Sequence, residues 1–140
     1  MATKKQIRKK LGTVYVLYQR IKALSGRLDM HYCLANKTSP TYSDVHCSSS
    51  DSSQRIEREV FNIVELKDEL ERLKKDYSKV YAEVFDIIQT LSSDKEKLVL
   101  EMRYLHTQDF QYIADEQNYS ISYVYSIHNA GIKHLMGIFV

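Results

Sequence analysis

The sequence predicts an all-α protein in which a long helical hairpin or coiled coil is followed by a three-helix helix-turn-helix domain. Only one Pro and four Gly occur among the 140 residues, which is few for a β-rich fold. Apolar residues recur at spacings of three and four over most of the chain, as they do on one face of a helix. Near the C-terminus, two short patterns of this kind meet across a tight break. We therefore expect a hairpin over residues 1–91 and a compact domain over residues 92–140.

Composition sets the first limits on location and function. Apolar residues make up 44% of the sequence, which is enough for a packed core. The two cysteines, Cys33 and Cys47, are too few for a disulfide framework, and no apolar run approaches the ~20 residues that span a bilayer. The apolar run behind the basic N-terminus is too short for a signal peptide. We expect a cytoplasmic protein with reduced thiols and no membrane partner.

Residues 4–28 are expected to form one amphipathic helix. Residues 1–28 contain eight basic residues and no acidic one. The basic face has two main interpretations: a solvated surface on a packing helix, or a surface that contacts the DNA backbone and offsets acidic charge elsewhere. Membrane-surface binding is a third, disfavoured because the apolar face lacks Trp and Phe. The apolar stripe consists of Ile7, Leu11, Val14, Tyr18, Ile21 and either Leu24 or Leu28.

Residues 29–53 are expected to form an irregular linker, because Pro40 and a serine-rich run over residues 48–53 oppose regular structure. Four potential metal ligands fall inside this segment, but their spacing is unusual for a zinc site and no CxxC pair occurs. We therefore expect neither a metal nor any other cofactor. The four potential ligands are His31, Cys33, His46 and Cys47.

Residues 54–91 are expected to form the longest helix. From Leu66 to Leu91 its apolar residues alternate strictly by four and three, which defines a heptad seam. Such a stripe must be buried against a partner. The N-terminal helix can cover part of it within the chain, and a homodimer formed through the 54–91 helix can cover the rest. Both arrangements remain open on the sequence.

The first helix of the C-terminal domain is expected to run from Asp94 to about Leu105. Ser93 and Glu96 are three residues apart, as in a capping box. Helical spacing then turns one set of apolar side chains toward the core. This set consists of Leu98, Val99, Met102 and Leu105.

Two further short helices complete the predicted helix-turn-helix. Phe110, Ile113 and Ala114 mark the apolar face of the first, and residues 118–120 form a break. Ser120 can cap the second helix, whose inward face carries Val124, Ile127 and Ala130. This orientation turns Ser122, Tyr123, Ser126 and Asn129 outward. The second helix of such a motif can enter a DNA major groove.

The run Glu101–Leu105, then Phe110–Ala114, then Tyr119-Ser120, Val124-Tyr125 and Ile127-His128 resembles the C-terminal domain of small phage transcription regulators. These are the RinA-like or ArpU-like late-gene activators of phages of Gram-positive bacteria. They in turn resemble region 4 of bacterial sigma factors, which reads the −35 promoter element. The resemblance implies activation of late or packaging genes in a bacterial host cell, binding to double-stranded DNA, and contact with host RNA polymerase.

The candidate DNA-binding residues follow from this resemblance and from the predicted outward face. The resemblance implies base reading at Ile121, Ser122, Tyr123 and Ser126. Relatives favour Arg, Glu and Gln there, so base reading in this chain would use hydroxyls and apolar contact with thymine methyls. Asn129 has the chemistry to read adenine, and an ordinary exposed role is the alternative for every candidate. The full set is Thr107 and Gln108, expected at a helix N-terminus that could hold a phosphate, then Ser120, Ser122, Tyr123, Ser126, Asn129 and Lys133.

The charge of the C-terminal domain opposes DNA binding, because residues 92–140 contain four basic and six acidic residues. One alternative is therefore a protein-interaction module that binds no DNA. A second is a small terminase-like DNA-packaging subunit, because such subunits also join a helix-turn-helix to a coiled coil. No glycine-rich phosphate loop, GxSxG or HExxH motif occurs, so we do not expect an enzyme.

Overall fold

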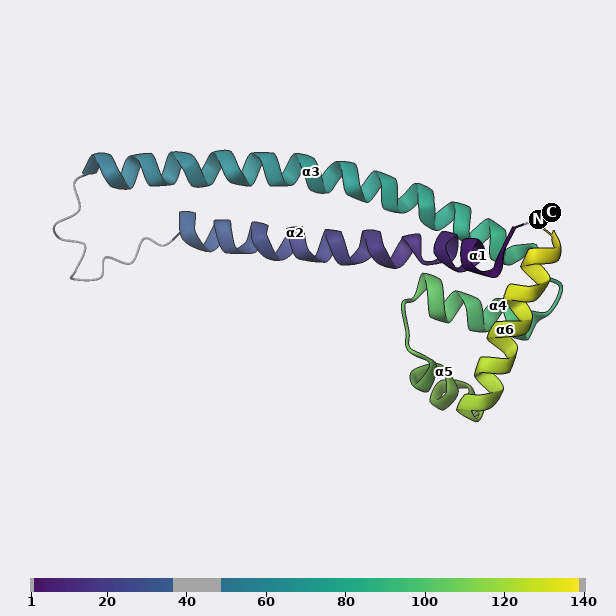
Figure 1. Ribbon diagram of the computed structural model, residues 1–140. Coiled ribbons are helices and arrows are strands. Elements are labelled where there is room, and N and C mark those ends of the chain that lie inside the picture. The colour runs from purple at the N-terminus through teal and green to yellow at the C-terminus, as the bar shows by residue number, and fades with distance from the viewer. Residues whose placement is uncertain (1, 37–48, 139–140) are drawn as a thin grey trace. The chain divides into compact units, whose positions relative to one another are not determined.

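The computed structural model describes residues 2–36 and 49–138, and all regular structure within them is helical, which confirms the all-α prediction (Figure 1). The chain divides into two compact units. Unit 1 comprises Met1–Tyr18 and Asp76–Val140, and unit 2 comprises Gln19–Lys75. The elements are α1 (Lys4–Leu11), α2 (Thr13–Ala35), α3 (Ser49–Gln89), α4 (Asp94–Leu100), the π-helical turn η2 (Glu101–Leu105), α5 (Phe110–Gln117) and α6 (Ile121–Ile138).

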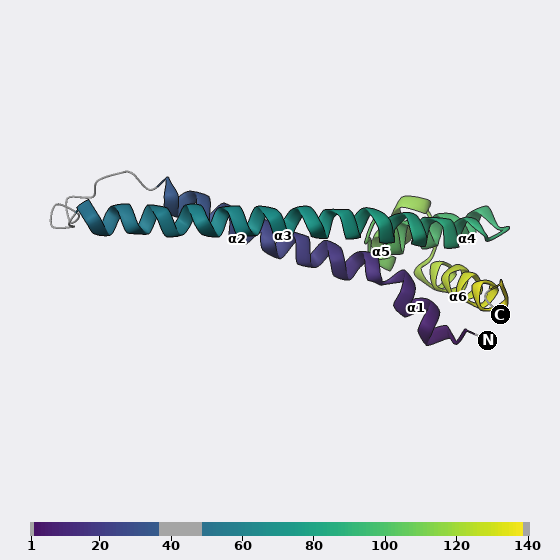
Figure 2. The ribbon, with the colours of Figure 1, turned by 90° about the horizontal axis from the view of Figure 1, so that it is seen from above.

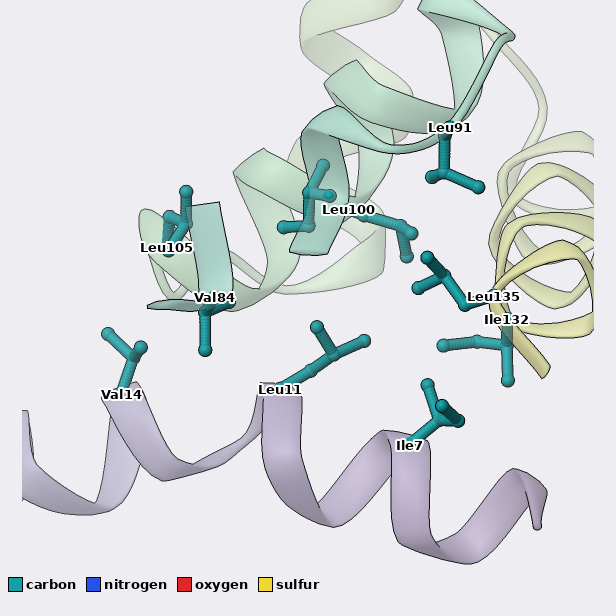
Figure 3. Packing of buried hydrophobic residues seen from close by; sticks show 10 residues of the cluster. Ile7, Leu11, Val14, Val84, Leu91, Leu100, Leu105, Ile132 and Leu135 are labelled. Carbon is teal, nitrogen blue, oxygen red and sulfur yellow. The ribbon is translucent and has the colours of Figure 1, made fainter. Parts of the chain in front are cut away.

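This division differs from the boundary expected at residue 91, because unit 1 contains parts of both segments that were assigned to the hairpin. The reason is a shared apolar core. Side chains from α1, the start of α2 and the end of α3 pack with side chains from α4, η2 and α6 (Figure 3). The buried members are Ile7, Leu11, Val14, Val84, Ile88, Leu91, Leu100, Leu105, Ile132 and Leu135.

The N-terminal segment forms two helices where one was expected. Thr3 caps α1, with its Oγ1 accepting from the backbone N–H of Gln6 and the Gln6 side chain accepting from the backbone of Thr3. Gly12 ends α1, and α2 then continues to Ala35. Helix therefore covers residues 29–35 and 49–53, which were expected to be irregular. Pro40, His46 and Cys47 lie outside the described residues.

Unit 2 consists of the C-terminal part of α2 and the N-terminal part of α3, which lie side by side (Figures 1 and 2). Leu24, Leu66 and Leu70 form its buried core, so the chain itself covers this part of the predicted seam. His31 Nδ1 lies 2.5 Å from Glu59 Oε2, which joins the two helices by a polar contact. The N-terminal part of α3 exposes four apolar side chains, those of Ile56, Val60, Phe61 and Val64.

The α4–η2 segment of unit 1 differs from its expected inward face. Val99, Met102 and Leu105 are buried as predicted, but Leu98 is 40% exposed and Leu100 is fully buried in its place. Only half of the predicted capping box forms: Ser93 Oγ accepts from the backbone N–H of Glu96. The Glu96 carboxylate instead reaches α6, where its Oε1 lies 2.5 Å from His134 Nδ1. The Glu96 side chain therefore links α4 to α6 and does not complete the capping box at the start of α4.

The predicted helix-turn-helix is present as α5 and α6. Asn118 ends α5 in the left-handed conformation, at φ 56°, and Ser120 Oγ accepts from the backbone N–H of Tyr123 at 3.2 Å to cap α6. Ile113 and Ala114 on α5 pack against Val124 and Ile127 on α6, as the spacing predicts. No helix in the described ranges is long and apolar enough to cross a lipid bilayer.

Candidate nucleic-acid interface

The first half of α6 has one buried and one exposed face. Val124, Ile127 and His128 are buried, and they fix the rotation of the helix about its axis. Residues on the opposite side are exposed, as the sequence predicts. They are Ser122, Tyr123, Ser126 and Asn129. We call this set the outer face of α6.

One edge of the outer face carries a lysine that sequence reasoning did not select. Lys95 Nζ of α4 donates to the Tyr123 hydroxyl at 3.2 Å, and this hydrogen bond raises the pKa of Lys95. The Tyr123 ring also packs edge-on against Tyr119, with 4.8 Å between ring centroids. Tyr123 is therefore held by two neighbours, and the positive charge of Lys95 lies beside its hydroxyl.

The other edge carries an arginine from the N-terminal helix. α1 packs against α6, and Arg8 Nη2 donates to Asn129 Oδ1 at 3.1 Å. The two residues are separated by 121 positions in the chain, so no local pattern could pair them. The excess of basic residues before residue 28 was the only sequence signal for this contact. Through it, the basic helix α1 lies beside the outer face.

His128 anchors α6 from its buried side. Its Nε2 lies 2.7 Å from the Tyr104 hydroxyl of η2, and its Nδ1 lies 3.3 Å from Asn129 Oδ1. Burial lowers the pKa of His128 to about 4, while the bond to Asn129 opposes that shift and the cations of Arg8, Arg103 and Lys4 add to it. The ring is therefore neutral near pH 7. In the Nδ1–H tautomer it accepts from Tyr104 and donates to Asn129.

A surface hollow of about 350 Å³ opens beside Asn129. Two guanidinium groups face it, from Arg8 on α1 and from Arg103 on η2. Arg103 lies over the ring of Phe110, with 4.6 Å from its Cζ to the ring centroid, and Phe110 packs against Tyr125 at 4.5 Å. Tyr104 and His128 complete the lining. We call this feature the arginine hollow.

The sequence predicts Thr107 and Gln108 at a helix N-terminus, but the structure does not place them within the start of a helix. They form the connection before α5, which is capped by Asp109: the backbone N–H of Tyr112 donates to Asp109 Oδ1 at 2.7 Å. Thr107 adopts φ 53°, and its hydroxyl donates to the carbonyl of His106. The carbonyl of Gln108 accepts from Arg103 Nη1. Because the Asp109 carboxylate occupies the helix start, that position would repel a phosphate.

The remaining predicted residues occupy separate positions on α6. Ser120 serves as the cap described above, so its oxygen is already engaged by the backbone. Lys133 is exposed and lies seven residues beyond Ser126, which places it on the same side of the helix two turns later. The structure thus brings Ser122, Tyr123, Ser126, Asn129 and Lys133 to one side of α6.

Metal coordination has no candidate in the described ranges, where no group of three or more His, Cys, Asp or Glu side chains could hold an ion. His31, one of the four ligands considered from the sequence, bonds with Glu59. Cys33 is exposed as a free thiol. His46 and Cys47 lie outside the described residues.

A family model with the description "Protein of unknown function (DUF1492)" matches residues 36–136, which extend from the end of α2 to near the end of α6. No curated protein and no solved structure matches the chain.

Proposed function

Since the chain belongs to the DUF1492 family, whose description names no activity, we propose its function from the geometry of unit 1. We propose a sequence-specific, DNA-binding transcription regulator of phage or prophage genes, acting as an activator. Its α6 helix would lie in the major groove of double-stranded DNA. The resemblance of its C-terminal domain to RinA-like and ArpU-like activators and to sigma factor region 4 supports the same proposal.

The observation that carries the proposal is the rotation of α6. Burial of Val124 and Ile127 turns a row of short polar and aromatic side chains outward along one helix. A major groove about 12 Å wide admits one α-helix, and base edges there accept and donate hydrogen bonds. The hydroxyls of Ser122, Tyr123 and Ser126 have this chemistry, and the Tyr123 ring suits a thymine methyl.

Basic residues beside the outer face offset the acidic charge of the C-terminal residues, which opposes DNA binding. Residues 76–140 contain nine acidic and five basic residues, whereas residues 1–18 contain five basic residues and no acid. α1 brings the second group to α6 within unit 1. Arg8 at one edge and Lys95 at the other are placed to contact phosphates on either side of a groove.

The test is binding to duplex DNA selected by the protein from a random pool. Tyr123→Ala and Ser126→Ala should each weaken binding to the selected duplex by about 1–3 kcal/mol, roughly 5- to 150-fold, if each contacts a base. Tyr18→Ala is the matched control for the tyrosine, since Tyr18 is 41% exposed and Tyr123 is 40% exposed. Ser78→Ala on α3 controls for the serine. Unchanged affinity in both α6 variants would remove these residues from the reading face.

Two partners belong to this proposal. Host RNA polymerase is implied by the resemblance alone. A homodimer through the 54–91 helix is supported by the exposed apolar side chains Ile56, Val60, Phe61 and Val64 on α3 of unit 2.

The same apolar side chains favour a second candidate function, a small terminase-like packaging subunit that assembles into rings. The mass of the protein in solution separates the two candidates. Eight or more copies would favour the packaging subunit, and two copies would favour the regulator. Absence of binding to any duplex at low salt, where charges are least screened, would instead favour a protein-interaction module.

A further inference from the structure

We propose that the arginine hollow binds a phosphate group, with Arg8 and Arg103 as its two donors. The inference rests on the proposed function insofar as the phosphate belongs to a DNA backbone flanking the bases that α6 reads. The same chemistry would accept free inorganic phosphate, and the experiment below distinguishes these sources.

The first argument is uncompensated charge. Arg8 donates to the neutral oxygen of Asn129, and Arg103 donates to the neutral carbonyl of Gln108. Neither forms an ion pair with a carboxylate in the part of the chain that the structure describes. A guanidinium carries five N–H donors, so each arginine retains several for a ligand. No carboxylate lines the arginine hollow.

The second argument is the field that neighbouring groups experience. Burial is the main cause of the lowered pKa of His128, and the charges of Arg8 and Arg103 lower it further. Burial raises the pKa of Tyr104, and the same two arginines oppose that rise. His128 and Tyr104, two of the side chains that line the hollow, therefore experience the positive charge of the arginines. An anion bound in the hollow would offset the positive charge of the two arginines.

The third argument is preorganisation, since a ligand gains more from donors that are already held in place. Arg103 is stacked on Phe110 and bonded to the Gln108 carbonyl, and Arg8 is held by Asn129. Arg103 lies within the π-helical turn, a distortion that occurs frequently at functional sites. Planar guanidinium groups match the oxygen geometry of a phosphate and bind it bidentately.

The location of the hollow favours a phosphate of the same duplex. Asn129 belongs both to the hollow and to the outer face of α6. A phosphate seated between the two arginines would therefore lie beside the groove that α6 would occupy. By contrast, a neighbouring hollow lined by Gly12, Tyr15, Arg103, Tyr104 and Thr107 also contains the carboxylate of Asp109. That carboxylate disfavours an anion there.

The DNA arm of the experiment measures how affinity for the selected duplex depends on salt. Loss of one phosphate contact should reduce the slope of log K against log salt by about 1. We expect this reduction for Arg8→Gln and for Arg103→Gln. Lys22→Gln, on α2 of unit 2, removes an equal charge from an exposed site and should leave the slope unchanged. Thermal melting checks folding, and Arg8→Gln alone carries the slope measurement if Arg103→Gln unfolds.

The phosphate arm uses inorganic phosphate alone, followed by NMR of the His128 ring and the Asn129 side-chain amide. We expect saturable shifts of both signals and a rise in the pKa of His128, because an added anion favours the charged imidazole. Both responses should disappear in Arg8→Gln and persist in Lys22→Gln. Chloride at equal ionic strength controls for general screening.

The two arms separate failure of this inference from failure of the proposed function. Slope changes in the arginine variants support a backbone phosphate as the ligand. If the protein binds no duplex but phosphate shifts His128 and Asn129, the proposed function fails while the hollow binds free phosphate. The inference is overturned if phosphate shifts neither signal and, in addition, either the arginine variants keep the wild-type slope or the protein binds no duplex.

Discussion

Gly131 of α6 lies so close to Leu100 of α4 that a Cβ added to the glycine would be 3.0 Å from Leu100 Cδ1. Leu100 is fully buried, so it has little room to move away. The absence of a side chain at residue 131 therefore sets the distance between the two helices. This close approach explains a glycine in the middle of a helix, where its flexibility would otherwise reduce stability.

Gly131→Ala should therefore lower the free energy of unfolding, by about 1–3 kcal/mol, because crowding outweighs the gain in helix propensity. Gly137→Ala is the matched control on the same helix, since nothing lies within 4 Å of its added Cβ. That control should raise stability by about 0.5–1 kcal/mol. Urea denaturation measures both. Equal stabilisation by the two alanines would contradict the close approach of α4 and α6.

His128 should make the protein less stable in mild acid. Its pKa is lowered from 6.5 to about 4 in the folded state, so between these values the unfolded chain binds a proton that the folded chain does not. Stability is therefore full above pH 6.5 and is lost as pH falls toward 4, by up to about 3 kcal/mol. His128→Gln should abolish this component of the pH dependence. Denaturation between pH 4 and 7 tests it, with the difference between variant and wild type cancelling the carboxylates.

Asp109 combines a structural role with an unfavourable charge near the candidate interface. Asp109→Ala should lower stability by about 1 kcal/mol, because the Tyr112 amide loses its acceptor. Asp109→Asn should keep that cap, since Asn and Asp cap helices about equally well. Removing the charge should also strengthen duplex binding a few-fold at low salt, roughly as expected for one phosphate-facing charge. Asp86→Asn on α3 provides the charge control, and equal effects of both asparagines would show that Asp109 has no special position.

Thr107 is held in a conformation that β-branched residues rarely adopt, at φ 53°. The left-handed region costs a non-glycine residue roughly 1–2 kcal/mol, and glycine adopts it freely. Thr107→Gly should therefore raise the melting temperature, even after the entropic cost of glycine is included. Thr90→Gly is the control, because Thr90 also bonds a nearby carbonyl but has a negative φ. Differential scanning calorimetry should find the second variant less stable than wild type.

The spacing of apolar residues correctly predicts the buried side of a helix where that helix is regular. The three-residue spacing of Val124 and Ile127 identified the buried side of α6, and therefore which neighbours are exposed. The inward face of α4 was harder, because residues 101–105 form a π-helical turn that shifts the phase of the pattern. The regular period consequently predicts an inward Leu98, whereas Leu100 is the buried residue. A regular 3.6-residue period cannot anticipate that change.

Two features of the candidate interface are not predictable from local sequence. One is a contact between distant segments, and the other is which of two residues caps α5. Arg8 meets Asn129 only because α1 folds onto α6, and nothing in the spacing of either segment specifies that contact. Both Thr107 and Asp109 are residue types that cap helices. Asp109 caps α5, and Thr107 instead adopts a left-handed conformation that amino-acid preferences disfavour rather than predict.

The shared core of α1, α4 and α6 has a consequence for how this polypeptide can change over evolutionary time. Ile7 and Leu11 fill space against Ile132 and Leu135, so two segments that lie far apart in the sequence build one packed core. Recombination that exchanged only the segment encoding α4 to α6 would pair mismatched surfaces and leave the core open to water. The two segments are therefore expected to be inherited together, or to change by compensating substitutions.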